Sequence, residues 1–314
     1  MISYYLSLRI KVNIMKKLLI SIIYIIEAFF LLLWIIICRL IGIDLSSKLG
    51  SLIIKFIGPI TKFDKRAAEN IKKVYPDLGL ETHKKLKKEM WDNLGRNIGE
   101  FAFAKKLNPY KKRNINSIRN KPRFIIEGEK YLKEIYKSKK GAIFFSAHIG
   151  NWEICPLILS AQGLKVTSIY RHANNPINEK IIQWLRQGIS IYSPKGPSGA
   201  KTLFKVLRNN EYAAILIDQK LNEGKTVKFL GHPAKTATAI AELSLKLSIP
   251  VVPIHVERIK GARFKYVIEK PIYNLKKQYN HDEELNILLE VINKTVGEWI
   301  LKNPSQWLWI HNRW

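Results

Sequence analysis

A long apolar run, Leu18 to Cys38, limits what this chain can fold into more than any other feature of its sequence. Ser21, Tyr24 and Glu27 are the residues that interrupt it. A helix over these positions is about 30 Å long at about 1.5 Å per residue, which matches the hydrocarbon core of a bilayer. The run therefore predicts a membrane-spanning helix.

The residues that flank this run favour an anchor helix that is retained over a signal peptide that is removed. Lys16 and Lys17 precede it, Arg39 follows it, and no small-residue cleavage site comes after it. We predict that residues 1–44 are a tail and a membrane-anchor helix. Glu27 is costly inside the span unless it faces protein, water or the interface, and we interpret it as accommodated by tilt or shallow placement.

Residues 45–314 are predicted to form the remaining domain, with 45–104 as an interfacial and helical lead-in. Lys48 and Lys55 share one helical face of the next apolar segment, which favours a helix lying in the membrane interface. Two further helices are expected before residue 105. The second carries apolar residues at helical spacing: Leu86, Met90, Leu94, Ile98 and Phe101.

The composition and net charge of the chain limit its fold class and the kinds of partner it can bind. Apolar residues make up 47% of the chain, which excludes wholesale disorder, and 53 Lys and Arg against 25 Asp and Glu give a net charge of +28. Such a charge favours an anionic membrane surface, an acidic carrier protein or nucleic acid. The basic segment 105–140 is either a solvated surface or a membrane-docking one. Cys38 and Cys155 have no disulfide or metal-ligand spacing, so we expect no disulfide framework and no zinc site.

From Gly141 onward, strand and helix patterns alternate. The expected strands end at Ala147, Tyr170, Ile217, His255 and Ile268. The expected helices are Trp152 to Ala161 with Asn151 as N-cap, Pro176 to Gln187, Ser198 to Asn209, Thr236 to Ser248, and Asp282 to Leu301. This succession predicts an α/β fold with a mainly parallel sheet flanked by helices, preceded by the anchor helix and the helical segment.

Three charged residues stand just past the ends of three predicted strands. They are His148, Arg171 and Asp218. Open parallel sheets bind ligands at the carboxyl edge of their strands, so we expect these side chains to converge on one crevice. Each residue also has a plain structural reading: a histidine near a glutamate by chance, an arginine on the surface, and an aspartate in a turn.

The pair His148 and Glu153 has the residue types of a base and its orienting carboxylate. Glu153 is expected in the first turn of the helix after His148, where it would hold the imidazole in one tautomer. Ser146 lacks the G-x-S-x-G context of a covalent nucleophile. The pattern therefore favours direct transfer, in which His148 removes a proton from a substrate hydroxyl that attacks an activated acyl group. Arg171 suits a phosphate because its planar fork binds two oxygens.

Six segments stand in the order of a known set of motifs: His148-Ile-Gly-Asn-Trp-Glu153, Tyr170-Arg171 with Asn174-Asn175-Pro176, Arg186-Gln187-Gly188, Asp218-Gln219, Val227 to Ala234, and Trp307 to Trp314. The first resembles the H-x4-D/E motif with the G-N-W-E continuation of the lipid A late acyltransferases, the lauroyl and myristoyl transferases of the lysophospholipid acyltransferase superfamily. The others resemble that family's later motifs, with Leu230 where phenylalanine is usual.

The resemblance implies an acyltransferase domain over residues 45–314. It would move a fatty acyl chain from acyl carrier protein to a hydroxyl of Kdo-bearing lipid IVA in lipopolysaccharide biosynthesis, at the cytoplasmic face of a bacterial inner membrane. The implied catalytic residues are His148 and Glu153, and the implied substrate-binding residues are Arg171, Asp218 and Arg186. Asp218 would either position Arg171 or organise the donor pocket. No cofactor, metal or nucleic acid is expected. Two alternatives stay open: another glycolipid or phospholipid acceptor, and a basic membrane-anchored binding protein without catalysis.

Overall fold

The structure is a computed structural model of the whole chain, and it describes residues 2–110, 122–273 and 280–314. Residues 111–121 of the basic segment 105–140 lie outside the described residues. The helices are α1 (Ile2–Ile41), α2 (Ile43–Ile57), α3 (Lys62–Val74), α4 (Leu80–Phe101), α6 (Glu129–Ser138), α7 (Leu157–Ala161), α8 (Pro176–Arg186), α9 (Pro197–Arg208), α10 (Ala239–Leu247) and α11 (His281–Lys302). Short 3-10 helices are η1 (Gly58–Ile60), η2 (Ala104–Lys106), η3 (Trp152–Ile154) and η4 (Pro304–Gln306).

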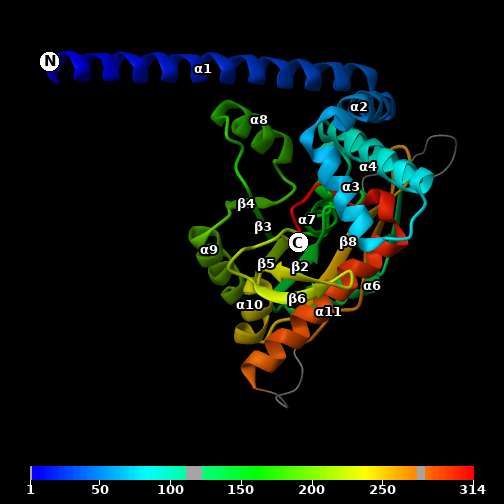
Figure 1. The fold of residues 1–314 in the computed structure, drawn as a ribbon. Helices are drawn as coiled ribbons and strands as arrows, with labels where there is room; N and C mark the ends of the chain where they lie inside the picture. Colours follow the sequence, from blue (N-terminus) through cyan, green and yellow to red (C-terminus); the bar gives the residue numbers. More distant parts are fainter. Residues whose placement is uncertain (1, 111–121, 274–279) are drawn as a thin grey trace.

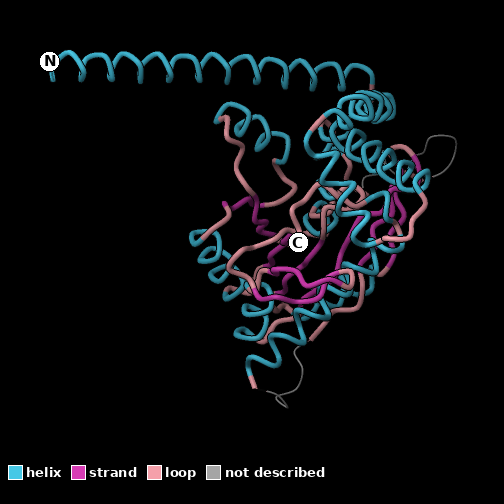
Figure 2. Tube along the Cα trace, in the orientation of Figure 1, coloured by secondary structure: helices cyan, strands magenta, loops and turns pink. Residues whose placement is uncertain are grey.

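A seven-stranded sheet forms the centre of the molecule, in the order β1-β9-β8-β2-β5-β3-β4 (Figures 1 and 2). Its strands are β1 (Phe124–Glu127), β2 (Ala142–Ser146), β3 (Val166–Tyr170), β4 (Ile191–Pro194), β5 (Tyr212–Leu216), β8 (Val251–Lys260) and β9 (Arg263–Ile268), and a separate hairpin joins β6 (Lys225–Phe229) to β7 (His232–Thr236). The pairing of β8 with β9 is antiparallel, and the other pairs in the sheet are parallel. The predicted α/β fold with a mainly parallel sheet is confirmed.

Strand β2 is buried on both faces because helices cover both sides of the sheet. Ile143 and Phe145 point into a core shared with α9, α10 and α11, whereas Ala142 and Phe144 point into a core shared with α6 and α7. Successive side chains of a strand face opposite sides of a sheet, so a central strand covered twice reads as a continuous apolar run. The chain that follows β2 therefore begins at a fixed and buried strand end.

Helix α1 includes a segment, Met15–Ile41, that is long and apolar enough to cross a membrane. Its buried residues are Ala28, Ile35 and Cys38, which share one face and lie against the rest of the protein. Figure 1 shows α1 running over α8 and α2 while its N-terminal part extends beyond the fold. Within Met15–Ile41 the exposed side chains are mainly large and apolar, the composition that a lipid environment favours.

Helix α2 buries its small residues and exposes its large ones. Ser46, Ser47, Gly50 and Ser51 are buried against α4, and the exposed apolar side chains include Leu45, Leu52 and Phe56. This is the reverse of a helix that packs its apolar face on a protein core. Helices that lie in a membrane interface also expose an apolar face, and the interfacial placement of this segment stays a prediction.

The second helix expected before residue 105 is α4. Its apolar residues at helical spacing are only partly buried: Leu86 and Met90 are inside, but Ile98 is 39% exposed. The buried face of α4 instead includes Asn93, Asn97 and Glu100, because distant polar groups pair with them.

The helix expected from Trp152 to Ala161 is divided by Pro156 into η3 and α7. Pro156 has no N–H to donate to Trp152 O, and Cys155 N donates to that oxygen instead (3.2 Å). The side chain of Asn151 caps no helix and donates to Glu100.

Packing of α2 on α4 depends on glycine. A Cβ at Gly95 would lie 2.3 Å from Gly50 O, so Gly95→Ala should destabilise the protein by about 1–3 kcal/mol through overpacking. Gly297, inside α11, is a matched control because its Cβ would meet only the Leu230 side chain at 3.4 Å. Gly297→Ala should hold or raise the thermal midpoint measured in detergent, since alanine favours helix. Equal midpoints for the two variants would contradict this account of the contact.

Candidate functional site

His148 and Asp218 meet at the carboxyl edge of the sheet. They follow the neighbouring parallel strands β2 and β5, which brings their side chains together as the sequence predicted. Asp218 Oδ1 lies 2.8 Å from His148 Nδ1, and Asp218 Oδ2 accepts a hydrogen bond from the main-chain N–H of His148 (2.9 Å). The carboxylate thus fixes both the ring and the backbone of the histidine.

The Asp218 carboxyl is fully buried and ionised. Burial would raise its pKa, but the neighbouring charge and ring N–H of His148, together with the indole N–H of Trp307 (2.8 Å), outweigh that effect and hold the pKa well below its usual range. An ionised carboxylate only accepts hydrogen bonds, so His148 Nδ1 must be the donor. The lone pair of the neutral ring is then on Nε2, the nitrogen that can take a proton.

The structure gives Glu153 a different partner from the one expected. Its carboxylate binds Arg186 through two contacts, Nε to Oε2 (3.0 Å) and Nη2 to Oε1 (2.8 Å), while the Nδ1 position of His148 is occupied by Asp218. The reason is local: Glu153 lies in the 3-10 turn η3 before Pro156. The guanidinium of Arg186, which was expected to bind substrate, donates to Glu153 instead.

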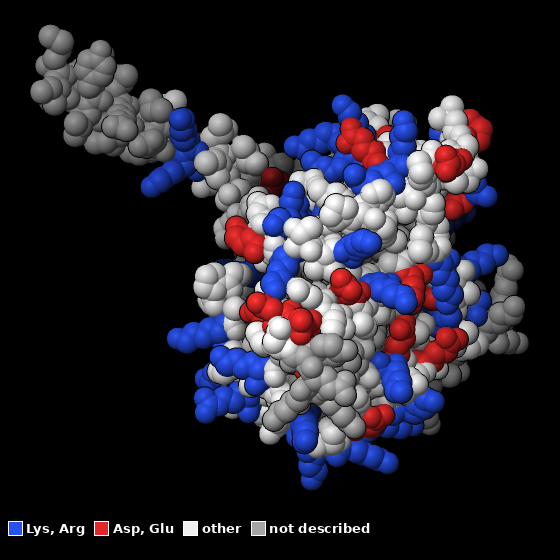
Figure 3. Space-filling view, turned by 60° about the horizontal axis from the view of Figure 1, so that its bottom comes forward, with Lys and Arg blue, Asp and Glu red and all other residues white. Residues whose placement is uncertain are grey.

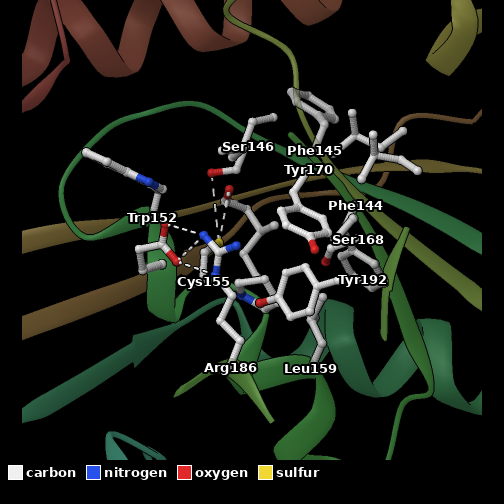
Figure 4. Close-up of a pocket in the computed structure, with 17 residues that line it drawn as sticks. Phe144, Phe145, Ser146, Trp152, Cys155, Leu159, Ser168, Tyr170, Arg186 and Tyr192 are labelled. Atoms are coloured by element: carbon white, nitrogen blue, oxygen red, sulfur yellow. Dashed lines mark hydrogen bonds and ion pairs between the residues drawn. The ribbon is translucent and has the colours of Figure 1, made fainter. Parts of the chain in front are cut away.

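A small apolar cavity lies beside this ion pair (Figure 4). Its volume is about 70 Å³, and its walls come from β2, β3, β4, β5, β8, η3, α7 and the end of α8. The lining includes Phe144, Leu159, Ile215, Trp152, Tyr170 and Tyr192. Trp152 also contacts the ring of His148, with centroids 5.3 Å apart, so the cavity adjoins the histidine.

Arg171 follows β3 at the same sheet edge but is not drawn into the His148–Asp218 pair. Its side chain is exposed, and one guanidinium nitrogen lies 3.4 Å from Asn174 Oδ1. Most of its donors therefore face solvent. Of the three residues expected to converge, the structure joins two and leaves the third free to bind a ligand.

Sequence reasoning assigned no site role to His311 or Trp307, although both lie in the C-terminal motif. The ring centroid of His311 is 4.5 Å from that of His148, and burial together with the nearby charge of His148 lowers the pKa of His311 to about 4. Asn70 fixes this segment by donating to the carbonyls of Trp309 and His311 (2.6 and 2.7 Å). The signal missed was a histidine and a tryptophan clustered near the chain's end.

A buried polar network holds the loop that follows His148. Gly150 O accepts hydrogen bonds from Asn93 (3.0 Å) and Asn97 (2.6 Å) of α4. Arg258 of β8 binds both asparagines and Glu100, which also accepts from Asn151 (2.7 Å). Gly150 has φ +57°, and a Cβ there would lie 1.6 Å from a main-chain oxygen of β8, so the loop needs glycine. These contacts fix the direction of the histidine.

The described part of the chain holds one group of three side chains that could together bind a metal ion. Its members are His148, Asp218 and His311, and their ligand atoms lie within 4.8 Å of one another. The Nδ1 and Oδ1 atoms of its first two members are already hydrogen-bonded to each other. A histidine hydrogen-bonded through Nδ1 to a carboxylate is the arrangement of a general base and its orienting group.

Comparison with known proteins agrees with the motifs. A family model described as bacterial lipid A biosynthesis acyltransferase matches residues 13–314. A comparison with curated proteins gave no match.

His311 should make the stability of the protein pH-dependent. Its folded pKa of about 4 lies below the unfolded value near 6.5, so the unfolded state binds the proton first and stability falls as pH falls through that window. His311→Asn should therefore lose less stability than the wild type between pH 7.5 and 5.0 in detergent unfolding experiments. The exposed His281→Asn variant is the control. Identical pH dependence in His311→Asn and wild type would contradict the burial of a neutral ring.

Proposed function

Because the chain belongs to the family of bacterial lipid A biosynthesis acyltransferases, we propose that it transfers a fatty acyl chain from acyl carrier protein to a hydroxyl of Kdo-bearing lipid IVA. The observation that carries the proposal is the His148–Asp218 pair, whose imidazole ring contacts Trp152 in the wall of an apolar cavity. This pair supplies a base at the place where an acyl chain has apolar walls to bind.

In the proposed reaction, His148 Nε2 takes the proton of the acceptor hydroxyl as its oxygen attacks the thioester carbonyl. Asp218 stabilises the imidazolium that forms, because its carboxylate is ionised and 2.8 Å from Nδ1. The tetrahedral intermediate then collapses, the carbon–sulfur bond breaks, and the thiolate of the carrier leaves with the proton held by His148. The new ester stays on the lipid, so no water and no covalent enzyme intermediate are needed.

The donor side of the proposal rests on the cavity and on charge. The aromatic and aliphatic lining of the cavity suits a fatty acyl chain, and the Glu153–Arg186 ion pair forms part of the same wall. Arg186 also lies over the rings of Tyr170 and Tyr192 at 5.4 and 5.0 Å. Glu153 thus supports the substrate pocket in this proposal by holding Arg186, rather than by orienting His148.

An acidic carrier protein fits the charge of this chain. The net charge is +28, and Figure 3 shows Lys and Arg side chains outnumbering Asp and Glu over one face. Opposite charges speed the encounter of two proteins and favour anionic membrane surfaces. Together with the apolar α1 and the exposed apolar face of α2, this supports a location on the cytoplasmic face of the inner membrane.

The acceptor is tested most simply by mass spectrometry of lipid A from cells with and without the gene. We expect cells lacking the gene to accumulate lipid A that is short of one acyl chain, and the wild-type gene to restore that chain. Unchanged lipid A together with a change in another acylated lipid would redirect the proposal to that acceptor. The His148→Ala gene should fail to restore either.

Purified variants separate the two carboxylates. Asp218→Asn should lower the transfer rate about 100- to 10,000-fold, close to His148→Ala, because the ring loses its orienting anion. Glu153→Gln keeps the shape of the side chain and one oxygen that can accept from Arg186. The transfer rate should therefore fall much less in this variant than in Asp218→Asn. The measurement is single-turnover transfer from acyl carrier protein at saturating acceptor. A larger loss in Glu153→Gln than in Asp218→Asn would return the orienting role to Glu153.

A further inference from the structure

Glu27 is the acidic residue inside the apolar run of α1, and the structure gives it a partner outside that helix. The side-chain amide of Asn175 donates to Glu27 Oε2 (2.9 Å) and to the main-chain oxygen of Tyr24 (2.8 Å). Asn175 is buried, at 3% exposed. A carboxylate in a membrane helix is expensive unless it is paired, so this contact explains why the acid is tolerated.

Asn175 links α1 to the loop that carries Arg171. Its side-chain oxygen caps α8 by accepting from Ile177 N (2.9 Å) and Asn178 N (3.3 Å), while its nitrogen reaches α1. The one amide therefore fastens the C-terminal end of the loop, residues 171–175, to the membrane helix.

Glu179 holds the rest of that loop. It accepts hydrogen bonds from Ala173 N (2.7 Å), from the hydroxyl of Tyr170, and from Gln183. Arg171 lies between Tyr170 and Ala173, which Glu179 holds on either side of it, and its own side chain is exposed. The backbone on both sides of Arg171 is thus fixed, and the guanidinium is left open.

Contacts further along α1 set the depth of this loop. Trp34 Nε1 donates to Ile98 O (3.3 Å), and the Arg39 guanidinium lies 4.4 Å from the ring centre of Trp184. Helix α1 lies along the protein from Tyr24 to Arg39. This stretch is about 23 Å long at about 1.5 Å per residue. The apolar residues of this run before Tyr24 begin at Leu18 and give only about 9 Å more, too little to cross a bilayer alone. The edge of the protein formed by α8 must therefore enter the membrane surface with α1.

We propose that Glu27 is a positioning residue of the acceptor site, through which the membrane helix holds the Arg171 loop at the level of lipid headgroups. The proposal rests on the proposed function and adds that Arg171, whose exposed fork suits a phosphate, binds an anionic group of the lipid acceptor. A phosphate at this level meets an arginine whose fork is free and whose backbone is fixed from both sides. The membrane helix is then part of the site as well as an anchor.

Three variants of α1 test the contact in the full-length protein. Glu27→Leu removes the acceptor and makes the helix more apolar, so membrane retention should not fall. Glu27→Gln keeps an oxygen that can accept from Asn175. Ser21→Leu is the matched control, because the Ser21 hydroxyl is exposed and bonds only within its own helix, to Lys17 O.

Transfer from acyl carrier protein to Kdo-bearing lipid IVA is measured in mixed micelles at varied acceptor mole fraction. Glu27→Leu should raise the KM for the lipid about tenfold, the size of one lost hydrogen bond to a charged group, with kcat within about twofold. Glu27→Gln and Ser21→Leu should match the wild type. A normal KM in Glu27→Leu, or an equal loss in Glu27→Gln, overturns the positioning role.

Arg171→Ala separates the two proposals. If Glu27 acts through Arg171, adding Glu27→Leu to Arg171→Ala should raise KM no further. A further rise, or a normal KM in Arg171→Ala beside a raised one in Glu27→Leu, shows that Glu27 acts elsewhere and overturns the inference. If the wild type fails to acylate this acceptor, the proposed function fails, and hydrogen exchange of residues 171–178 still decides the contact: faster exchange in Glu27→Leu than in Glu27→Gln supports it, and equal exchange overturns it.

Discussion

The buried Asp218 carboxylate is the group on which the site depends. It accepts hydrogen bonds from the main chain and ring of His148 and from the indole of Trp307, and so joins the end of β5, the loop after β2 and the C-terminal segment. Burying a carboxylate costs several kcal/mol unless its donors are all in place. The three segments therefore stabilise one another, and the fold that satisfies the carboxylate also fixes the histidine.

Two sets of contacts link the site to the apolar helices α1 and α2. Arg258, Glu100 and the asparagines of α4 hold the loop after His148, and α4 packs closely on α2, whose exposed face is apolar. On the other side, α1 contacts the loop after β3 through Asn175. In the proposed function the base and the residues that bind the lipid acceptor must be placed relative to the bilayer, and we propose that these two chains of contacts supply that placement.

The sequence predicted those parts of the site that depend on strand order. His148 and Asp218 follow apolar strands, and parallel strands bring their carboxyl ends to one edge. The sequence did not identify the partner of His148, because a spacing of five residues does not reveal that Pro156 ends the first turn and that Arg186, 33 residues away, binds Glu153. Trp307 lies 89 residues from Asp218, and contacts over such distances leave no local periodicity. The buried asparagines of α4 were missed for the same reason, since Arg258 comes far later in the chain.

We propose that His148, held by Asp218, is the base that activates the acceptor hydroxyl. A structure of the protein with the lipid acceptor and a non-hydrolysable acyl-phosphopantetheine bound would test this role directly. We expect the reacting hydroxyl within about 2.6–3.2 Å of His148 Nε2, with the Asp218 contact to Nδ1 kept. A hydroxyl placed beside Glu153, or a His148 ring turned away from Asp218 in the complex, would contradict it.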